Sequence, residues 1–161
     1  MSLAAPKSIK PKDWQSRGNP QNLLGHSIFV VDEGPANAPV ILLLHGFPTS
    51  SWDWNLIWES LKKDYRLIAL DMLGFGFSDK PNRRDYSIHQ QADIVEALVK
   101  KYQLKEFHVL AHDYGDTVAQ ELLSRQIEEN GAGYWLSCCF LNGGLFPETH
   151  RALLTQKLLL S

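Results

Sequence analysis

Cysteine is scarce in this sequence: its 161 residues include only Cys138 and Cys139, which are neighbours. Adjacent cysteines cannot close an ordinary structural loop, and their spacing does not suit a zinc site. We therefore expect two reduced thiols, buried on a core strand, and neither a metal nor another cofactor. The lack of a disulfide framework favours a cytoplasmic protein.

Long apolar segments are also missing. The longest runs, Val40–Leu44 and residues 67–70, are far shorter than the roughly 20 residues that span a bilayer. Residues 1–12 contain no apolar core of the length found in signal peptides. The net charge is −2, and no basic cluster with interleaved aromatic residues occurs. Neither nucleic acid nor a membrane is therefore expected as a partner.

What the sequence does contain is an alternation of strand-like and helix-like patterns. Ser87 is a candidate N-cap before one helical stripe of apolar residues. The alternation predicts an α/β fold with a mostly parallel sheet and helices on both faces. The predicted strands are 26–32 and 40–44, joined by a turn, then 65–71, 106–111 and 135–141; the predicted helices are 51–61, 86–102, 116–129 and 149–160.

The segment from Ala111 to Gly115 lies where a strand is expected to turn directly into a helix. Small residues two positions on either side of a central residue mark a nucleophile elbow, a strained turn that lifts the central side chain clear of the sheet. Here that residue is Asp113. The helix dipole favours its ionised form by about 0.3–1 kcal/mol. An ionised carboxylate can displace halide or open an epoxide, which leaves an ester for histidine-activated water to hydrolyse.

Hydrolysis of such an ester requires an oxyanion hole. His45-Gly46-Phe47-Pro48 follows a predicted strand, and we expect the backbone N–H groups of Phe47 and Tyr114 to form the hole. Each donor in such a hole contributes about 2.7–4 kcal/mol. His45 and His112 adjoin these motifs and are expected to orient the loops rather than to act as bases.

A glycine-rich turn, beginning at Asp71 and containing Gly74 and Gly76, follows another strand. A dinucleotide site would need a third glycine and a helix N-terminus for the pyrophosphate. Asp79 stands at the third glycine position, and Lys80-Pro81 follows it. The turn therefore predicts a tight structural loop beside the active site.

Together these motifs resemble the α/β-hydrolase superfamily, and in particular its aspartate-nucleophile branch of epoxide hydrolases and haloalkane dehalogenases. The resemblance extends over most of the chain after about residue 22. It implies a core sheet of eight strands with a helical cap inserted after the sixth. Residues 1–146 then correspond to the first six strands of the core and 147–161 to the start of the cap. The last two strands, the acid and the catalytic histidine would lie in the remainder of the domain, and His150 is not expected to replace that histidine.

Two positions depart from the dehalogenase pattern. Dehalogenases usually carry tryptophan after the nucleophile, and many carry asparagine after the His-Gly pair, where this chain has Tyr114 and Phe47. One dehalogenase group places its acid just after the sixth strand, where this chain has Asn142. Phe47, Tyr114, His45, His112 and Asn142 are all candidate substrate-binding residues.

The resemblance implies a hydrolase acting on a small-molecule substrate. Our first hypothesis is an epoxide-hydrolase-like enzyme that takes an apolar, small to medium substrate through an ester at Asp113. Alternatives are a haloalkane or fluoroacetate dehalogenase and a hydrolase-fold protein that binds a ligand or partner without turnover. Residues 1–161 alone are expected to be inactive, because the rest of the hydrolase domain is needed for a complete fold.

Overall fold

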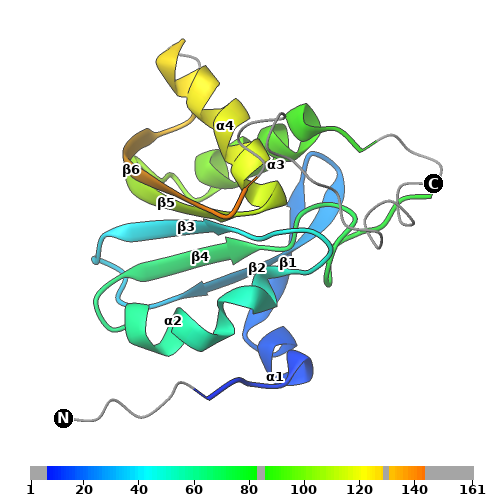
Figure 1. The fold of residues 1–161 in the computed structure, drawn as a ribbon, viewed down its shortest axis with the longest axis vertical. Coiled ribbons are helices and arrows are strands. Elements are labelled where there is room, and N and C mark those ends of the chain that lie inside the picture. The colour runs from blue at the N-terminus through cyan, green and yellow to red at the C-terminus, as the bar shows by residue number, and fades with distance from the viewer. Residues whose placement is uncertain (1–6, 83–85, 129–130, 144–161) are drawn as a thin grey trace.

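The computed structural model describes residues 7–82, 86–128 and 131–143 of the protein. Helices lie on both sides of one sheet (Figure 1). The elements in chain order are α1 (Pro11–Gln15), β1 (Gly18–Leu23), β2 (His26–Glu33), β3 (Val40–Leu44), the 3-10 turn η1 (Ser51–Trp54), α2 (Asn55–Leu61), β4 (Arg66–Leu70), α3 (Ile88–Lys101), β5 (Glu106–His112), α4 (Tyr114–Ile127) and β6 (Tyr134–Leu141).

The strands of the described sheet lie in the order β1-β2-β4-β3-β5-β6. The β1–β2 and β2–β4 pairs are antiparallel, whereas the β4–β3, β3–β5 and β5–β6 pairs are parallel. This confirms the predicted α/β class with a mostly parallel sheet. The turn after β2 joins it to β3 in sequence, but the two strands do not pair, because β4 lies between them.

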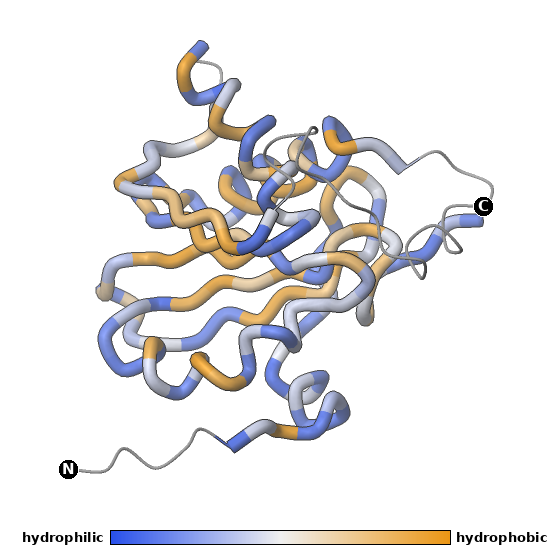
Figure 2. The backbone as a smooth tube through the Cα atoms, viewed as in Figure 1, coloured by the Kyte–Doolittle hydropathy of each residue, from blue (hydrophilic) through white to orange (hydrophobic). Residues whose placement is uncertain are grey.

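Two layers of apolar side chains cover the two faces of the sheet. Leu42 and Leu44 of β3 face one way and pack with apolar residues of α3 and α4. Leu43 faces the other way and packs with Trp54 and Trp58 of η1 and α2. Because both faces are covered, β3 and β4 are apolar along nearly their whole length, as the hydrophobic colouring in Figure 2 shows.

The helices confirm the local signals and correct their boundaries. Ser87 caps α3, and its hydroxyl accepts a hydrogen bond from the Gln90 N–H at 3.1 Å. The helix expected over 51–61 begins with one 3-10 turn and continues as α2. Helix α4 begins at Tyr114, two residues earlier than predicted, because the elbow leads into it directly.

Two elements, α1 and β1, give no clear periodic signal in the sequence. The β1 segment reads Gly-Asn-Pro-Gln-Asn-Leu, which is poor in β-branched and apolar residues and includes Pro20. Proline is tolerated in an edge strand, where its missing N–H costs little. Strand β1 therefore forms because β2 pairs with it over six residues from Gly18 to Leu23, not because of its own propensity.

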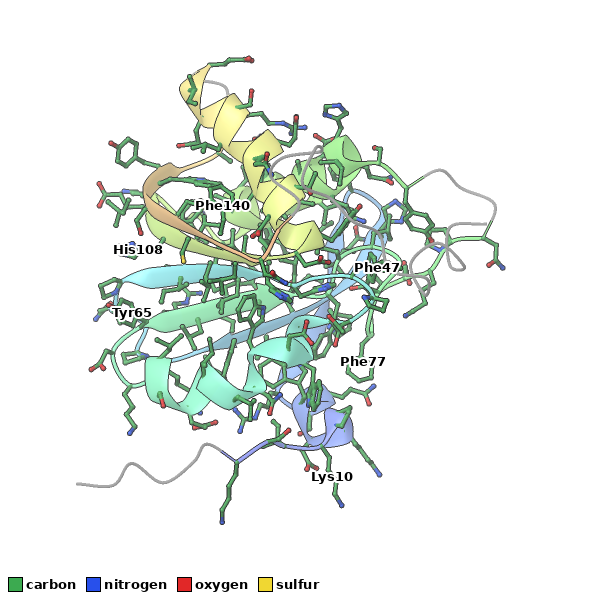
Figure 3. All side chains as sticks on the ribbon, viewed as in Figure 1. Lys10, Phe47, Tyr65, Phe77, His108 and Phe140 are labelled. Atoms are coloured by element: carbon green, nitrogen blue, oxygen red, sulfur yellow. The ribbon has the colours of Figure 1, made fainter. Side chains whose placement is uncertain are left out.

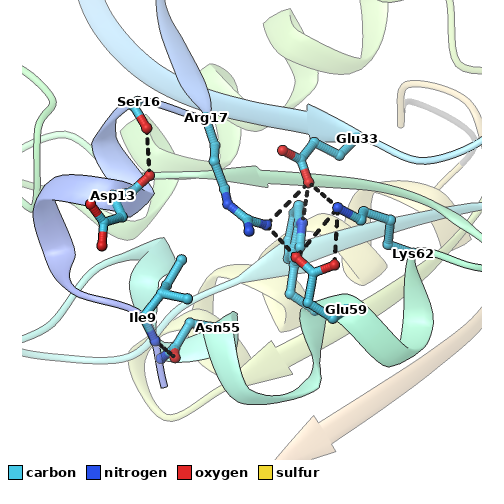
Figure 4. Close-up of polar contacts among 9 residues, drawn as sticks. Ile9, Asp13, Ser16, Arg17, Glu33, Asn55, Glu59 and Lys62 are labelled. Carbon is cyan, nitrogen blue, oxygen red and sulfur yellow. Dashed lines mark hydrogen bonds and ion pairs between the residues drawn. The ribbon is translucent and has the colours of Figure 1, made fainter. Parts of the chain in front are cut away.

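Polar contacts attach the N-terminal segment to β2 and α2 (Figure 4). The guanidinium of Arg17 pairs with Glu33 of β2 at 3.3 Å and with Glu59 of α2 at 2.6 Å. Lys62 bridges the same two carboxylates, at 3.1 Å to each. Trp14 is completely buried and donates its indole N–H to the Ser51 hydroxyl at 2.9 Å. These contacts attach α1 to the sheet and to the loop that follows β3.

Strand β6 corrects the expectation of two buried thiols. Cys138 and Cys139 are both free, but Cys138 is half-buried and Cys139 is exposed. Cys138 packs against the apolar core on the α3 and α4 side of the sheet, and burial raises the pKa of its thiol to about 12. Side chains alternate between the two faces of a strand, so Cys139 points to the other face of this edge strand.

The part of the chain assigned to the cap, 147–161, lies outside the described residues, as does the helix expected over 149–160. Among the residues that are described, no helix combines the length and apolar character needed to cross a membrane.

Candidate active site

Asp113 occupies the turn between β5 and α4. Its backbone has φ 51° and ψ −113°, in a region that side-chain-bearing residues rarely adopt. Such a conformation costs on the order of 1–3 kcal/mol and persists only where the surrounding structure holds it. The Asp113 carbonyl accepts the Asp116 N–H at 3.0 Å, so the helix begins immediately after the turn. This is the geometry expected of a nucleophile elbow.

The small residues of the elbow have a steric reason. Ala111 is fully buried at the end of β5. Gly115 lies against the end of β3: a Cβ at this position would come within 2.4 Å of the Leu44 carbonyl oxygen and 2.7 Å of that of His45. Any side chain at 115 would therefore push α4 away from β3 and disturb the elbow.

The loop after β3 approaches the carboxylate of the elbow. The backbone N–H of Phe47 donates a hydrogen bond to Oδ2 of Asp113 at 2.8 Å, across 66 positions of sequence. Tyr114 is the first residue of α4, and the N–H groups of a first helical turn have no acceptor within the helix. The two backbone groups that the sequence suggests as oxyanion donors are those of Phe47 and Tyr114. Phe47 contacts the Asp113 carboxylate, and Tyr114 follows Asp113 in the chain.

An aromatic cluster of Phe47, Phe75 and Tyr114 lies beside the elbow. The ring centroids of Phe47 and Phe75 are 6.1 Å apart, and those of Phe75 and Tyr114 are 5.7 Å apart. Phe47 is 39% exposed, and Figure 3 places it at the opposite end of the sheet from Tyr65 and His108. Burial raises the pKa of the Tyr114 phenol, and a hydrogen bond with Gln91 offsets part of this effect.

His45 is completely buried and bonded at both ring nitrogens. Its Nδ1 lies 2.8 Å from the Gly46 carbonyl oxygen, and its Nε2 accepts the Met72 N–H at 2.9 Å. Burial lowers the pKa of His45, so the ring is held neutral with its proton on Nδ1. Contrary to its inclusion among the substrate-binding candidates, His45 offers no free nitrogen to a ligand and instead joins the loop after β3 to the turn after β4.

His112 and Asn142 lie on either side of the elbow. His112 is the last residue of β5, and Asn142 follows the neighbouring strand β6. The His112 ring is half-buried and stands edge-on to Trp54, with centroids 6.4 Å apart. Asn142 follows β6 and is exposed, with a left-handed φ of 56°, which asparagine tolerates better than most residues. The Asp113 N–H donates to the Leu141 carbonyl at 3.0 Å, which brings the end of β6 beside Asp113.

The glycine-rich turn is tied to the loop after β3 by a buried carboxylate. Asp71 is fully buried, and its two oxygens accept the N–H groups of Ser51 at 2.8 Å and Phe77 at 2.7 Å. No group of three or more potential metal ligands occurs in the described segments. The two hydrogen bonds of Asp71 hold the turn against the loop after β3, in agreement with the structural role that its sequence suggests.

One residue of this region is missed by sequence reasoning. Asp116 looks like an ordinary acidic residue in the first turn of a helix, yet it is fully buried. Its Oδ1 accepts the Leu141 N–H at 3.3 Å. The sequence offers one signal for this role, which is that Asp116 directly follows Gly115 of the elbow. Its burial depends on β6, which is distant in sequence.

Comparison with known proteins agrees with this geometry. The family model described as the alpha/beta hydrolase fold matches residues 39–148. The chain therefore belongs to the α/β-hydrolase family.

Individual relatives show which members of the family this chain is similar to. The chain is 52% identical over 163 residues to the mesoderm-specific transcript homolog protein of Bos taurus, covering 96% of the chain and 48% of that protein. It thus spans about half the length of this relative. A haloalkane dehalogenase from Bradyrhizobium elkani is similar in structure, with TM-score 0.70, 28% identity, and coverage of 78% of this chain and 41% of that one. An epoxide hydrolase structure from metagenomes of hot environments is also similar, with TM-score 0.70 and 28% identity. The match covers 78% of this chain and 42% of that one.

Proposed function

We propose that the complete protein is a hydrolase that acts through an ester at Asp113, in the manner of an epoxide hydrolase, on an apolar substrate of small to medium size. The observation that carries the proposal is the hydrogen bond from the Phe47 N–H to Oδ2 of Asp113 at 2.8 Å. It leaves Oδ1 as the oxygen that attacks and holds Oδ2 in the position where negative charge develops later.

In the first step, Oδ1 of Asp113 attacks a ring carbon of the epoxide. A carbon–oxygen bond to the enzyme forms, the ring carbon–oxygen bond breaks, and the released oxygen takes up a proton from an acidic side chain. In our proposal this acid belongs to the part of the protein that its longer relatives possess beyond this segment. The product is an alkyl ester whose carbonyl oxygen is Oδ2. This atom already accepts the Phe47 N–H, so no rearrangement is needed before hydrolysis.

In the second step, water attacks Cγ of Asp113, and Oδ2 becomes the oxyanion. The backbone N–H groups of Phe47 and Tyr114 stabilise it, each by about 2.7–4 kcal/mol. The bond between Cγ and Oδ1 then breaks, so Oδ1 leaves in the diol and the oxygen of water stays in the carboxylate. The histidine that activates this water belongs, in our proposal, to the part of the protein that its longer relatives possess beyond this segment.

The surroundings of Asp113 support an apolar substrate. The Phe47, Phe75 and Tyr114 rings lie beside the elbow and present no charged group. Binding sites for small molecules are mostly apolar, with a few polar groups that fix orientation. A cytoplasmic location is a further proposal, based on cysteine usage. The assignment of 1–146 to the core and 147–161 to the cap is also a proposal, based on the resemblance to the family.

A dehalogenase is the second candidate, because haloalkane dehalogenases share the fold at 28% identity. The nucleophile would be the same, but halide leaves more readily when side-chain N–H groups bind it. Phe47 has no side-chain donor and Tyr114 has no indole N–H, which favours the epoxide. Release of chloride or fluoride from a haloalkane or fluoroacetate, without diol formation from epoxides, would favour the second candidate, and binding without turnover of either would favour a non-catalytic protein.

The test of the proposed function is to trap the ester. The complete protein is mixed with 4-nitrostyrene oxide, an apolar epoxide, and quenched in acid within milliseconds. We expect the peptide that contains Asp113 to gain the mass of the epoxide. A single turnover in ¹⁸O-labelled water should place the heavy oxygen in Asp113 and not in the diol. Label on another residue, or heavy oxygen in the first diol released, would contradict the mechanism.

The side chain of Tyr114 gives a second prediction. Its backbone N–H has the proposed role, whereas its phenol bonds to Gln91. A hydrogen bond of this kind contributes about 0.5–1.5 kcal/mol, so Tyr114→Phe should keep turnover of 4-nitrostyrene oxide within about tenfold of the unmodified protein. A loss of several orders of magnitude in steady-state kcat would show that the phenol contacts the leaving oxygen.

A further inference from the structure

Asp116 is a buried carboxylate beside the elbow to which the mechanism above gives no task. It lies in the first turn of α4 and is fully buried. Its Oδ1 accepts the Leu141 N–H at 3.3 Å, while its Oδ2 has no hydrogen-bond partner of ordinary geometry among the described residues. Burial of a carboxyl group costs free energy unless the group is hydrogen-bonded. The bond to Leu141 therefore indicates that Asp116 holds a neighbouring segment.

The partner of Asp116 is the residue that also holds the nucleophile. Leu141 is bonded through both of its backbone groups: its N–H donates to Asp116, and its carbonyl accepts the Asp113 N–H at 3.0 Å. The Asp116 N–H in turn donates to the Asp113 carbonyl at 3.0 Å. Asp113, Asp116 and Leu141 therefore form a closed ring of hydrogen bonds that joins the start of α4 to the end of β6.

The turn after β6 also packs on this carboxyl group. A Cβ on Gly143 would lie 2.1 Å from Oδ2 of Asp116 and 2.4 Å from its Cβ. Glycine is thus required where the chain leaves β6, because the backbone passes directly over Asp116. The same side chain consequently sets both the position of the elbow and the path of the chain beyond Asn142.

We propose that Asp116 is a positioning residue for the Asp113 nucleophile, which clamps the end of β6 to α4 and so maintains the left-handed elbow. This inference rests on the proposed ester mechanism. Asp113 has an unfavourable φ of 51°, and such a conformation needs neighbouring contacts to hold it. Without the clamp, Leu141 loses one of its two anchors, and Oδ1 of Asp113 loses its alignment with the substrate.

The clamp requires a hydrogen-bond acceptor and not a negative charge. Burial raises the pKa of Asp116, and so does the negative charge of Asp113, while His112 and the Leu141 and Gly143 N–H groups act in the opposite direction. The neutral form keeps a carbonyl oxygen for the Leu141 N–H. Asparagine has the same shape and the same acceptor, so it should replace Asp116, whereas alanine should not.

The experiment compares rates of ester formation in the complete protein. With 4-nitrostyrene oxide and a rapid acid quench, Asp116→Ala should slow labelling of Asp113 by about a hundredfold, the effect of a misplacement near 1 Å. The epoxide concentration that gives half the maximal labelling rate should change by less than about threefold, since misalignment acts on the chemical step and not on binding. Asp116→Asn should label within about fivefold of the unmodified rate, on the same reasoning. If Asp116→Ala does not fold, Asp116→Leu fills the volume without an acceptor and should give the same slow labelling.

Glu96 offers a matched control. It is a second largely buried carboxylate, and its Oε1 has no hydrogen-bond partner among the described residues. Its Oε2 lies 3.5 Å from Arg125. It belongs to α3 and has no hydrogen bond to the elbow. Glu96→Gln should alter thermal stability but leave the labelling rate unchanged.

Three results would overturn the inference while the ester mechanism stands. They are normal labelling in Asp116→Ala, equally slow labelling in Asp116→Asn, and equal slowing by Glu96→Gln. An unmodified protein that forms no ester at Asp113 would overturn the proposed function, and the inference with it. Faster amide exchange at Leu141 and Asp113 in Asp116→Ala, but not in Asp116→Asn, is the expected result of a separate measurement that needs no substrate.

Discussion

Asp113→Ala is expected to abolish turnover in the complete protein while leaving it folded. Removal of a catalytic nucleophile typically costs several orders of magnitude in kcat, and we expect a loss of at least about 10⁴-fold here. Among the described residues, the Asp113 side chain accepts one hydrogen bond, from the Phe47 N–H. Its removal should therefore leave the core packing intact. The measurement is steady-state hydrolysis of 4-nitrostyrene oxide together with a thermal unfolding curve.

Asp93→Ala is the control for this prediction. Asp93 is an aspartate on α3 that is 53% exposed, and its partner is Arg125 at 2.7 Å. Exposed ion pairs contribute about 0–1 kcal/mol, so this variant should hydrolyse the epoxide at the normal rate. Retention of full activity by Asp113→Ala would remove the nucleophile assignment and with it the whole ester mechanism.

Residues 1–161 expressed alone are expected to associate or remain loosely folded and to show no turnover. Tyr134, Leu136 and Leu141 of the edge strand β6 are 64%, 47% and 38% exposed. An open apolar sheet edge promotes association between chains. Folding stability is a small difference between large terms, so a sheet whose strand β6 leaves apolar side chains exposed has little stability to spare.

This prediction is checked by comparing the isolated segment with the complete protein. Light scattering reports association, a urea titration reports cooperativity, and diol formation reports turnover. A monomeric 1–161 segment with a sharp unfolding transition and repeated turnover would contradict the expectation. It would also require His112 or His150 to activate the water, since both ring nitrogens of His45 are already bonded.

The two carboxylates at the start of α4 show why the complete protein is needed for these tests. Asp113 is the proposed nucleophile, and Asp116 holds the end of β6 from which the chain continues past Gly143. Both are bonded to Leu141 at the end of β6. Measurements on the intact chain therefore separate a chemical defect from a loss of folding.

The sequence by itself determined the features that depend on local physics. Continuous apolar runs predict the strands β3 and β4, because a strand covered on both faces is apolar along its length. An apolar stripe with helical period after Ser87 predicts the capped helix α3. The order of motifs predicts the α/β-hydrolase class, since the elbow needs small residues on both sides of Asp113 wherever it occurs.

Tertiary structure alone decided what depends on pairing between distant segments. The edge strand β1 has almost no strand propensity and exists because β2 pairs with it. The Phe47 N–H reaches Asp113 across 66 positions. Asp116 is fully buried and bonded to Leu141 at the end of β6, which is distant in sequence. No local pattern encodes these contacts, because the free energy that stabilises them comes from surfaces that meet only after the chain has folded.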